Sequence, residues 1–120
     1  IAQGVLAFCL AAQGGEQEQA RARELLLTAE PGAAADGTFT YWIAKVHALL
    51  GDSAAALDWI RKAANLGYWD APWMRKDAAL ANLHGLSAFV ALTEEIEVRQ
   101  RAFRAFVNKE APAGLGLEPL

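Results

Sequence analysis

The sequence predicts an all-α fold, and three observations support this prediction. Apolar residues make up 54% of the 120 residues, and Ala and Leu dominate while β-branched residues are few; such a composition favours packed helices over sheet. Gly and Pro residues divide the chain into runs with apolar side chains at helical spacing. The apolar pattern of one predicted helix returns 34 residues later. A chain of this length forms one domain or a piece of one and can bury a core.

The first two helices are predicted over residues 2–13 and 16–29. Gly14-Gly15 ends the first helix, and Pro31-Gly32 ends the second before a loop over residues 33–37. The apolar face expected to point inward in the first helix is Val5, Leu6, Phe8, Cys9 and Ala12. The buried stripe expected in the second helix is Ala22, Leu25, Leu26 and Ala29.

The next two helices are predicted over residues 38–50 and 53–66. Gly51 separates them, Asp52 or Ser53 caps the second of the two, and Gly67 ends it. The inward side chains expected in residues 38–50 are Phe39, Trp42, Ile43, Val46 and Leu50.

The C-terminal part is predicted to contain two short helices and one long helix. Asp70 followed by Pro72 marks the start of a helix that runs to about residue 76. Asp77 caps another short helix to residue 83, and Gly85 precedes a long helix over residues 87–108. The inward positions expected there are Phe89, Leu92, Ile96, Phe103 and Phe106, with Arg99 burying only its stem. A flexible tail is expected over residues 110–120.

The segment AKVHALLGDSAAALDWIRKAANLG, residues 44–67, resembles a tetratricopeptide repeat. Gly51-Asp52 stands at the turn, and Ala56 and Ala63 stand at the small positions. The residues Ala22, Leu25, Leu26 and Ala29 align with Ala56, Trp59, Ile60 and Ala63, each pair 34 residues apart, which is the length of this repeat. The chain departs from the family at Ala44, where Gly is usual, at His47, where an aromatic residue is common, and after Leu66, where no closing Pro follows.

The stretch GYWDAPWMRKDAALANLHGLSAFVAL is similar to the C-terminal capping region of bacterial tetratricopeptide regulatory proteins. The residues that carry this similarity are Gly67, Tyr68, Trp73, Met74, Asp77, Leu80, Leu83, Phe89 and Leu92. Ala78 replaces the usual Pro, and His84 replaces a common Arg. Such regions commonly follow kinase, adenylate cyclase or winged-helix DNA-binding domains, whose motifs do not occur in these 120 residues.

The resemblance implies tetratricopeptide-like antiparallel helix hairpins in a right-handed α-solenoid, closed by a long C-terminal capping helix. The repeat domain is expected over residues 1–109, with hairpins at about 1–30 and 37–67 and a cap at about 70–108. The resemblance also implies a non-enzymatic scaffold that binds a peptide or partner protein on its concave face, within a larger bacterial regulatory protein. The partner-binding residues expected on this face are Thr38, Tyr41, Trp42, Lys45 and Ala48.

Composition also excludes several classes of function. The net charge of −3 argues against a nucleic-acid partner, because nucleic-acid binders carry a basic patch or stripe. Cys9 is the single cysteine, so no intramolecular disulfide or cysteine-based metal site is possible, and a cytoplasmic location is expected. The apolar run over residues 1–12 is too short to span a bilayer, so no membrane partner is expected.

Three side-chain groups suggest chemistry, and each has a simpler explanation. Cys9 with His47 and His84 suggests a thiol nucleophile, but a buried structural thiol is favoured. Glu94, Glu95 and Glu97 suggest a metal site, but a solvated acidic face is favoured. A basic helix end suggests a membrane surface or an acidic partner, but favourable interaction with the helix dipole explains it; its residues are Arg99, Arg101, Arg104 and Lys109. No catalytic residue, metal or cofactor is therefore expected.

Two alternatives to the scaffold remain open. A repeat missing before Ile1 would leave an apolar end that two chains could close by pairing, which makes the chain a dimerisation domain. A small helical enzyme that uses Cys9 or the glutamate cluster is the other alternative, and it is disfavoured.

Overall fold

Every element in the computed structural model is helical, and the model describes residues 2–33 and 36–110. No strand occurs within these two ranges, so the all-α prediction is confirmed for them. The elements, in chain order, are α1 (Ala2–Gln13), α2 (Glu16–Ala33), α3 (Gly37–Leu49), α4 (Ser53–Asn65), α5 (Ala71–Lys76), the 3₁₀ helix η1 (Ala78–Leu83) and α6 (Ser87–Glu110). Residues 111–120 of the predicted flexible tail lie outside the described residues. Its first residue, Glu110, belongs to α6.

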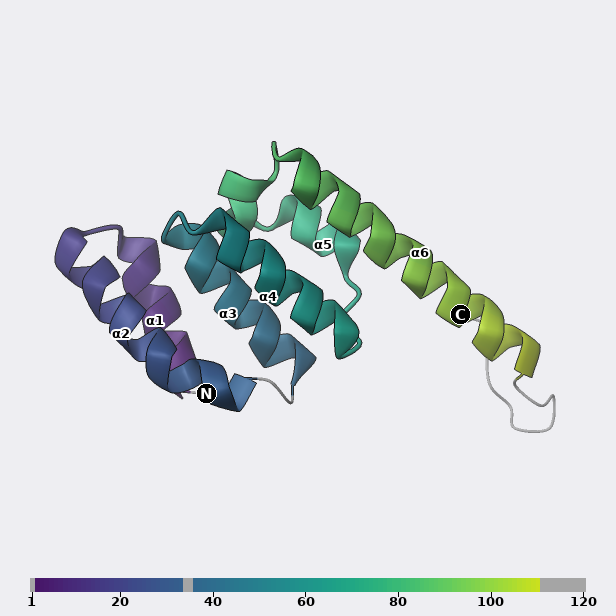
Figure 1. The fold of residues 1–120 in the computed structure, drawn as a ribbon, viewed down its shortest axis with the longest axis horizontal. Helices are drawn as coiled ribbons and strands as arrows, with labels where there is room; N and C mark the ends of the chain where they lie inside the picture. Colours follow the sequence, from purple (N-terminus) through teal and green to yellow (C-terminus); the bar gives the residue numbers. More distant parts are fainter. Residues whose placement is uncertain (1, 34–35, 111–120) are drawn as a thin grey trace.

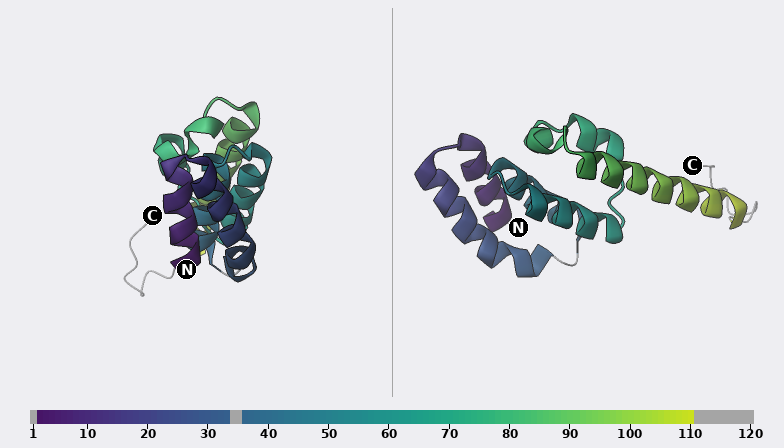
Figure 2. Two further views of the ribbon diagram at one scale, coloured as in Figure 1. Left: turned by 90° about the vertical axis from the view of Figure 1, so that its left-hand side faces the viewer. Right: turned by 45° about the horizontal axis from the view of Figure 1, so that its top comes forward.

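The helices follow one another along an elongated molecule of 57 × 30 × 18 Å (Figure 1). Helices α1 and α2 form one pair, and α3 and α4 form the next. Both α1 and α2 contact α3. On the other side, η1 packs against α3, and α6 packs against α4 and α5. The chain is thus a row of packed helix pairs with α3 at its centre (Figure 2).

The turn between α3 and α4 is the one that the sequence predicts. Gly51 has a φ of +83°, in the left-handed region where a side chain is unfavourable. The amides of Gly51 and Asp52 donate to the carbonyls of Ala48 and His47, which lie at the end of α3. Asp52 holds the N-cap position of α4 without a side-chain cap hydrogen bond, and its carboxylate lies 3.7 Å from Arg23 of α2 instead.

Helix α2 runs further than the sequence predicts. It was expected to end at Pro31-Gly32, but it continues through both residues to Ala33. Proline lacks an amide hydrogen, yet its fixed φ of about −65° is itself helical. The chain can therefore keep helical dihedrals for a few residues after a proline that follows a well-formed helix.

Two clusters of buried residues lie on opposite sides of α3. The first joins α3 to α1 and α2 and contains Ala7, Ala11, Ala22, Leu26, Ala29, Ile43, Val46 and Leu50. The second joins α3 to α4, α5, η1 and α6 and includes Tyr41, Ala44, Ala48, Ile60, Met74, Leu80, Leu83, Phe89 and Ile96. The many alanines let the helix axes approach closely, as the predicted small positions Ala56 and Ala63 do in α4.

The buried face of α1 differs from the predicted one. Gly4, Ala7 and Ala11 are buried, while the predicted inward residues Val5, Leu6, Cys9 and Ala12 are exposed and Phe8 is half-buried. The close packing of α1 explains the difference, because a Cβ atom at Gly4 would overlap the ring of Phe39 in α3. Small residues form the closest contact with α3, Phe8 packs at its edge against Trp42, and Val5 and Leu6 are exposed.

The second half of α6 also departs from the prediction. Phe89, Leu92 and Ile96 are buried as expected, but Phe103 is 46% exposed and Phe106 is 62% exposed. Helix α6 extends past the other helices (Figure 1), so its last turns have little to pack against. None of the helices described here combines the length and the apolar character that crossing a membrane requires.

Candidate interaction site on the α1–α3 face

Helix α3 presents a narrow partly open stripe between the two buried clusters. Thr38, Trp42, Lys45 and Leu49 follow one another at steps of four, three and four residues, which places them on one line along the helix. Thr38 is exposed, and Trp42 and Leu49 are half-buried. Val5 and Phe8 of α1 border the stripe, since Phe8 contacts Trp42 and Val5 lines a hollow with it. We call this surface, made of Val5, Phe8, Thr38, Trp42, Lys45 and Leu49, the α1–α3 face.

The structure corrects the predicted exposure of three site residues. Tyr41, Lys45 and Ala48 were expected on an exposed stripe, but they are 2%, 9% and 0% exposed. Tyr41 and Ala48 belong to the buried cluster that joins α3 to α4 and η1. The open stripe lies closer to α1 than expected. Of the predicted partner-binding residues, Thr38 is exposed and Trp42, which was also expected to point inward, is half-buried.

Lys45 is buried because its ammonium is surrounded by aromatic rings. Its Nζ lies 4.6 Å from the ring centre of Trp42, 5.1 Å from that of Tyr41 and 5.4 Å from that of Phe8. These distances are in the range of cation–π attraction. The rings of Phe8 and Trp42 meet edge to face at 4.9 Å, so α1 and α3 together build the aromatic surroundings of this cation.

Asp77 supplies the negative charge opposite Lys45. Its Oδ2 lies 3.3 Å from the Lys45 Nζ and accepts a hydrogen bond of 2.7 Å from the Tyr41 hydroxyl. Its other oxygen accepts from the Ala79 amide, as expected of the predicted cap. Asp77 is 5% exposed and is the single residue between α5 and η1. Its carboxylate therefore links the junction of these two helices to α3.

The Tyr41 hydroxyl is held in its neutral form. Burial raises the pKa of Tyr41 well above its ordinary value of about 10, and the hydrogen bond to Asp77 raises it further. The ring of Tyr68 stacks on Tyr41 at 4.6 Å, and burial raises the pKa of Tyr68 as well. Both phenols therefore remain hydrogen-bond donors at neutral pH.

A hollow of about 180 Å³ lies beside the aromatic cluster. Val5, Phe39 and Trp42 form apolar walls, and Asp36 and Thr38 are polar residues on its lining. Asp36 is fixed in place because its side chain accepts from the Phe39 amide and caps α3. An apolar wall with polar groups at the rim suits a side chain of a peptide whose backbone stays in water.

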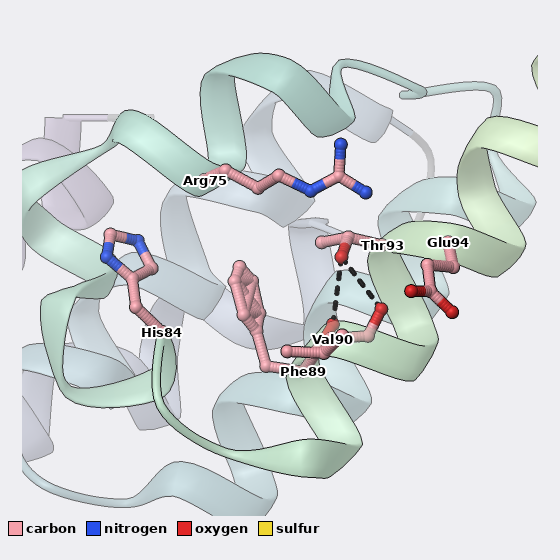
Figure 3. A pocket seen from close by; sticks show the side chains of 6 residues that line it. All are labelled: Arg75, His84, Phe89, Val90, Thr93 and Glu94. Atoms are coloured by element: carbon pink, nitrogen blue, oxygen red, sulfur yellow. Dashed lines mark hydrogen bonds between the residues drawn. The ribbon is translucent and has the colours of Figure 1, made fainter.

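A second hollow, of about 310 Å³, lies between α5, the end of η1 and α6 (Figure 3). Phe89 and Val90 provide its apolar part. Two of its polar side chains are used within the protein, since Arg75 pairs with Glu97 and Thr93 donates to the carbonyls of Phe89 and Val90. Because its cation is already paired, this hollow offers less for recognition than the α1–α3 face.

Both histidines, Glu95 and Glu97 have structural partners, and Glu94 is exposed. The Nε2 of His47 donates to Glu30 of α2 at 2.8 Å, and the Nε2 of His84 donates to the carbonyl of Met74 at 3.0 Å. Cys9 is exposed on α1, so the expectation of a buried thiol is wrong. Glu95 pairs with Arg61, and Glu97 also pairs with Arg101. Within the described ranges no group of three or more His, Cys, Asp or Glu residues could hold a metal ion.

Sequence reasoning missed the two residues that complete the environment of Lys45. Asp77 was identified as a helix cap, and Phe8 was identified as an inward residue of the first helix. Neither is near Lys45 in sequence, and only the packing of α1 and η1 against α3 brings them together. The helical spacing of Thr38, Trp42, Lys45 and Leu49 is shared by the stripe through Tyr41, so spacing alone did not identify the open stripe.

Comparison of the chain with protein-family models, with curated proteins and with solved structures finds no match.

Proposed function

We propose that this chain is a non-enzymatic interaction module that binds a peptide segment of a partner protein on the α1–α3 face. The observation that carries the proposal is the hollow of about 180 Å³ between α1 and α3, with the half-buried Trp42 as one wall. Aromatic residues that are partly open and held rigidly are the side chains that dominate binding at protein interfaces. Trp42 is held in this way by Phe8 and Lys45.

The order of the helices supports an open binding face. Helices α1, α3 and η1 contact one another in succession, and α2, α4 and α6 lie behind or beside them. We interpret this as tetratricopeptide-like hairpins in a right-handed solenoid, in which the first helices of successive units line the concave side. We further propose that the module acts inside a larger bacterial regulatory protein in the cytoplasm, as the resemblance of residues 67–92 implies.

The lining of the hollow indicates what the peptide presents. An apolar side chain would contact Val5, Phe39 and Trp42, and backbone amides of the peptide would donate to Asp36 or Thr38. Removing the apolar side chain and the exposed parts of the walls from water stabilises such a complex. Tyr41 and Ala48 support α3 from behind and do not touch the peptide, because they are 2% and 0% exposed.

A selection from a phage-displayed random peptide library tests this function without a known partner. The target is wild type, and the counter-target is the Val5→Arg/Thr38→Arg double variant, which fills the hollow with exposed charged side chains. Peptides that carry an apolar residue should bind wild type and lose about tenfold or more in affinity on the variant, a loss of about 1.4 kcal/mol. In a matched control, Leu27→Arg changes a residue of α2 that is 76% exposed and should leave binding unchanged. Failure to select any peptide, or selection of peptides indifferent to the double variant, would contradict the proposal.

Self-association is a second candidate function, and the projecting part of α6 favours it. Val98 and Phe106 are 55% and 62% exposed there, and exposed apolar side chains on one helix suit pairing with a second chain. Sedimentation equilibrium would show a dimer for wild type and a monomer for Phe106→Glu. A wild-type chain that stays monomeric at high concentration removes this candidate.

A further inference from the structure

The surroundings of the Lys45 ammonium have the composition of a cation-binding site. Three aromatic rings lie 4.6, 5.1 and 5.4 Å from it, and the Asp77 carboxylate lies 3.3 Å from it. Proteins that recognise alkylammonium ligands use such aromatic cages, because the faces of the rings attract a cation that has lost water. Here a lysine of the same chain occupies the cage.

The cage is built almost without the lysine. Phe8 comes from α1, Tyr41 and Trp42 come from α3, and Asp77 precedes η1. Asp77 is held by the Tyr41 hydroxyl and the Ala79 amide, and Phe8 and Trp42 hold each other. Lys45 contributes one ammonium at the end of a flexible four-carbon stem. The stem can turn toward water while the rings and the carboxylate keep their places.

We propose that Phe8, Tyr41, Trp42 and Asp77 form a cation-binding cage, which Lys45 closes in the free protein and which a lysine side chain of the bound peptide enters in its place. The proposal rests on the peptide-binding function above and specifies the chemistry of the peptide. Trp42 is shared by the cage and the hollow. A peptide seated in the hollow therefore has its neighbouring side chains within reach of the cage.

Charge at Asp77 makes the exchange selective. A buried carboxylate without a partner is strongly unfavourable, and Asp77 is 5% exposed. A neutral side chain that displaced Lys45 would leave Asp77 unpaired, whereas an incoming ammonium restores the ion pair. Lys45 thus acts as an internal competitor within the cage, which excludes apolar and acidic side chains from the cage and yields to a cationic side chain.

Chemical rescue of Lys45→Ala tests the cage directly. This substitution removes the internal cation and the side-chain carbons beyond Cβ, which leaves room for n-propylammonium, and n-propanol serves as the neutral control of similar shape. At a concentration about ten times its dissociation constant, n-propylammonium should raise the unfolding midpoint of the variant by about 5 °C more than n-propanol does. Wild type should show no such difference, because Lys45 fills its cage.

Two further variants identify the cause of the rescue. Lys45→Ala/Asp77→Asn keeps the rings and removes the charge, so the preference for n-propylammonium should disappear. Lys45→Met fills the cage with a neutral side chain of similar length and should not respond. If Lys45→Ala is unfolded in buffer, recovery of its far-UV circular dichroism with n-propylammonium, and not with n-propanol, is the expected result. Equal effects of the two additives on Lys45→Ala, folded or unfolded, would overturn the cage.

The result of the rescue experiment does not depend on the result of the peptide selection. Rescue without any selected peptide would leave a cation cage and remove the peptide-binding function. Selected peptides that bind the α1–α3 face, together with no rescue, would leave the peptide-binding function and remove the cage.

Discussion

At the scale of single residues, Asp77 links α3 to η1 through three partners. Its two oxygens accept from the Tyr41 hydroxyl and the Ala79 amide and face the Lys45 ammonium. The pair is almost closed to water, with side-chain exposures of 7% for Asp77 and 11% for Lys45. Such a pair adds little net stability over a well-packed apolar pair, but removal of one member is costly.

We expect Asp77→Ala to lower the free energy of unfolding by about 3 kcal/mol, because a cation, a hydroxyl and an amide lose their shared acceptor. Urea unfolding followed by circular dichroism measures this loss. Asp58→Ala is the matched control, since Asp58 pairs with Lys62 at 3.4 Å on the open surface of α4 and should cost at most about 0.5 kcal/mol. Equal costs for the two variants would contradict the role given to Asp77.

Tyr41 makes stability sensitive to alkaline pH. Its pKa is raised by burial in the folded chain, so above about pH 10 the unfolded chain loses the phenol proton while the folded chain keeps it. Folding is then opposed as pH rises, and the stability that Tyr41 contributes below pH 10 declines. The stability advantage of wild type over Tyr41→Phe should shrink by about 1.4 kcal/mol between pH 8 and pH 11. Urea unfolding at both pH values tests this, and a constant advantage would contradict it.

At the scale of elements, the sharp turn after α3 sets how α4 returns along it. Gly51 has a positive φ there, and the Leu50, Gly51 and Asp52 amides satisfy carbonyls at the end of α3. Polar contacts then fix the α3–α4 pair to α2. Arg23 donates to the Leu50 carbonyl at 3.2 Å, and His47 donates to Glu30 at 2.8 Å. The turn and these contacts together join α2, α3 and α4.

Gly51→Ala should destabilise the fold by about 1–2 kcal/mol, because a side chain is disfavoured at positive φ. The matched control is Gly85→Ala, which places a methyl group where no atom lies within 4 Å and where φ is not positive. We expect Gly85→Ala to stay within about 0.5 kcal/mol of wild type. Thermal unfolding of the two variants measures both changes. A larger loss of stability in Gly85→Ala than in Gly51→Ala would contradict this account of the turn.

Sequence patterns predicted where the helices begin and end better than they predicted which side chains are exposed. Gly and Asp residues at Gly14, Gly51, Asp70 and Asp77 marked breaks and caps that the structure contains, because turns and caps are decided locally. The side of α3 that stays open is decided by neighbours far away in sequence. Stripes through Tyr41 and through Trp42 have similar helical spacing, and only the packing of η1 on Tyr41 buries one of them.

The same reasoning explains the errors at the two ends of the chain. Cys9 and Phe106 both lie at helical spacing with apolar neighbours, so periodicity predicted burial for each. Burial also requires a second surface, and neither residue is covered by another helix within the described residues. Periodicity identifies an apolar face but does not supply its partner.

At the scale of the whole molecule, α6 has a packed half and a projecting half (Figure 2). Phe89, Leu92 and Ile96 are buried, and the Arg61–Glu95 pair joins the helix to α4. Farther along, Phe103 keeps an edge-to-face contact with Trp69 at 5.3 Å, and most side chains beyond it are exposed. The first half is packed against other helices and most of the second half is exposed, so the two halves should differ in local stability.

Hydrogen exchange should separate these halves. Amides of residues 90–97 are expected to exchange as slowly as those of α4, and amides of residues 104–110 at least about tenfold faster, because helix ends without tertiary packing open locally. Exchange measured by NMR on dilute protein tests this, with α4 as the internal reference. Uniform protection to Glu110 would contradict it, and protection that appears only in concentrated samples would support pairing through α6.

The projection of α6 carries the chain away from the other helices. With a rise of 1.5 Å per residue, the helix carries the chain about 10 Å beyond Phe103 by the time it reaches Glu110. A fluorescent reporter joined directly after Glu110 would stand clear of the α1–α3 face. Energy transfer from such a reporter to a dye on a bound peptide would then report where along the row of helices the peptide lies.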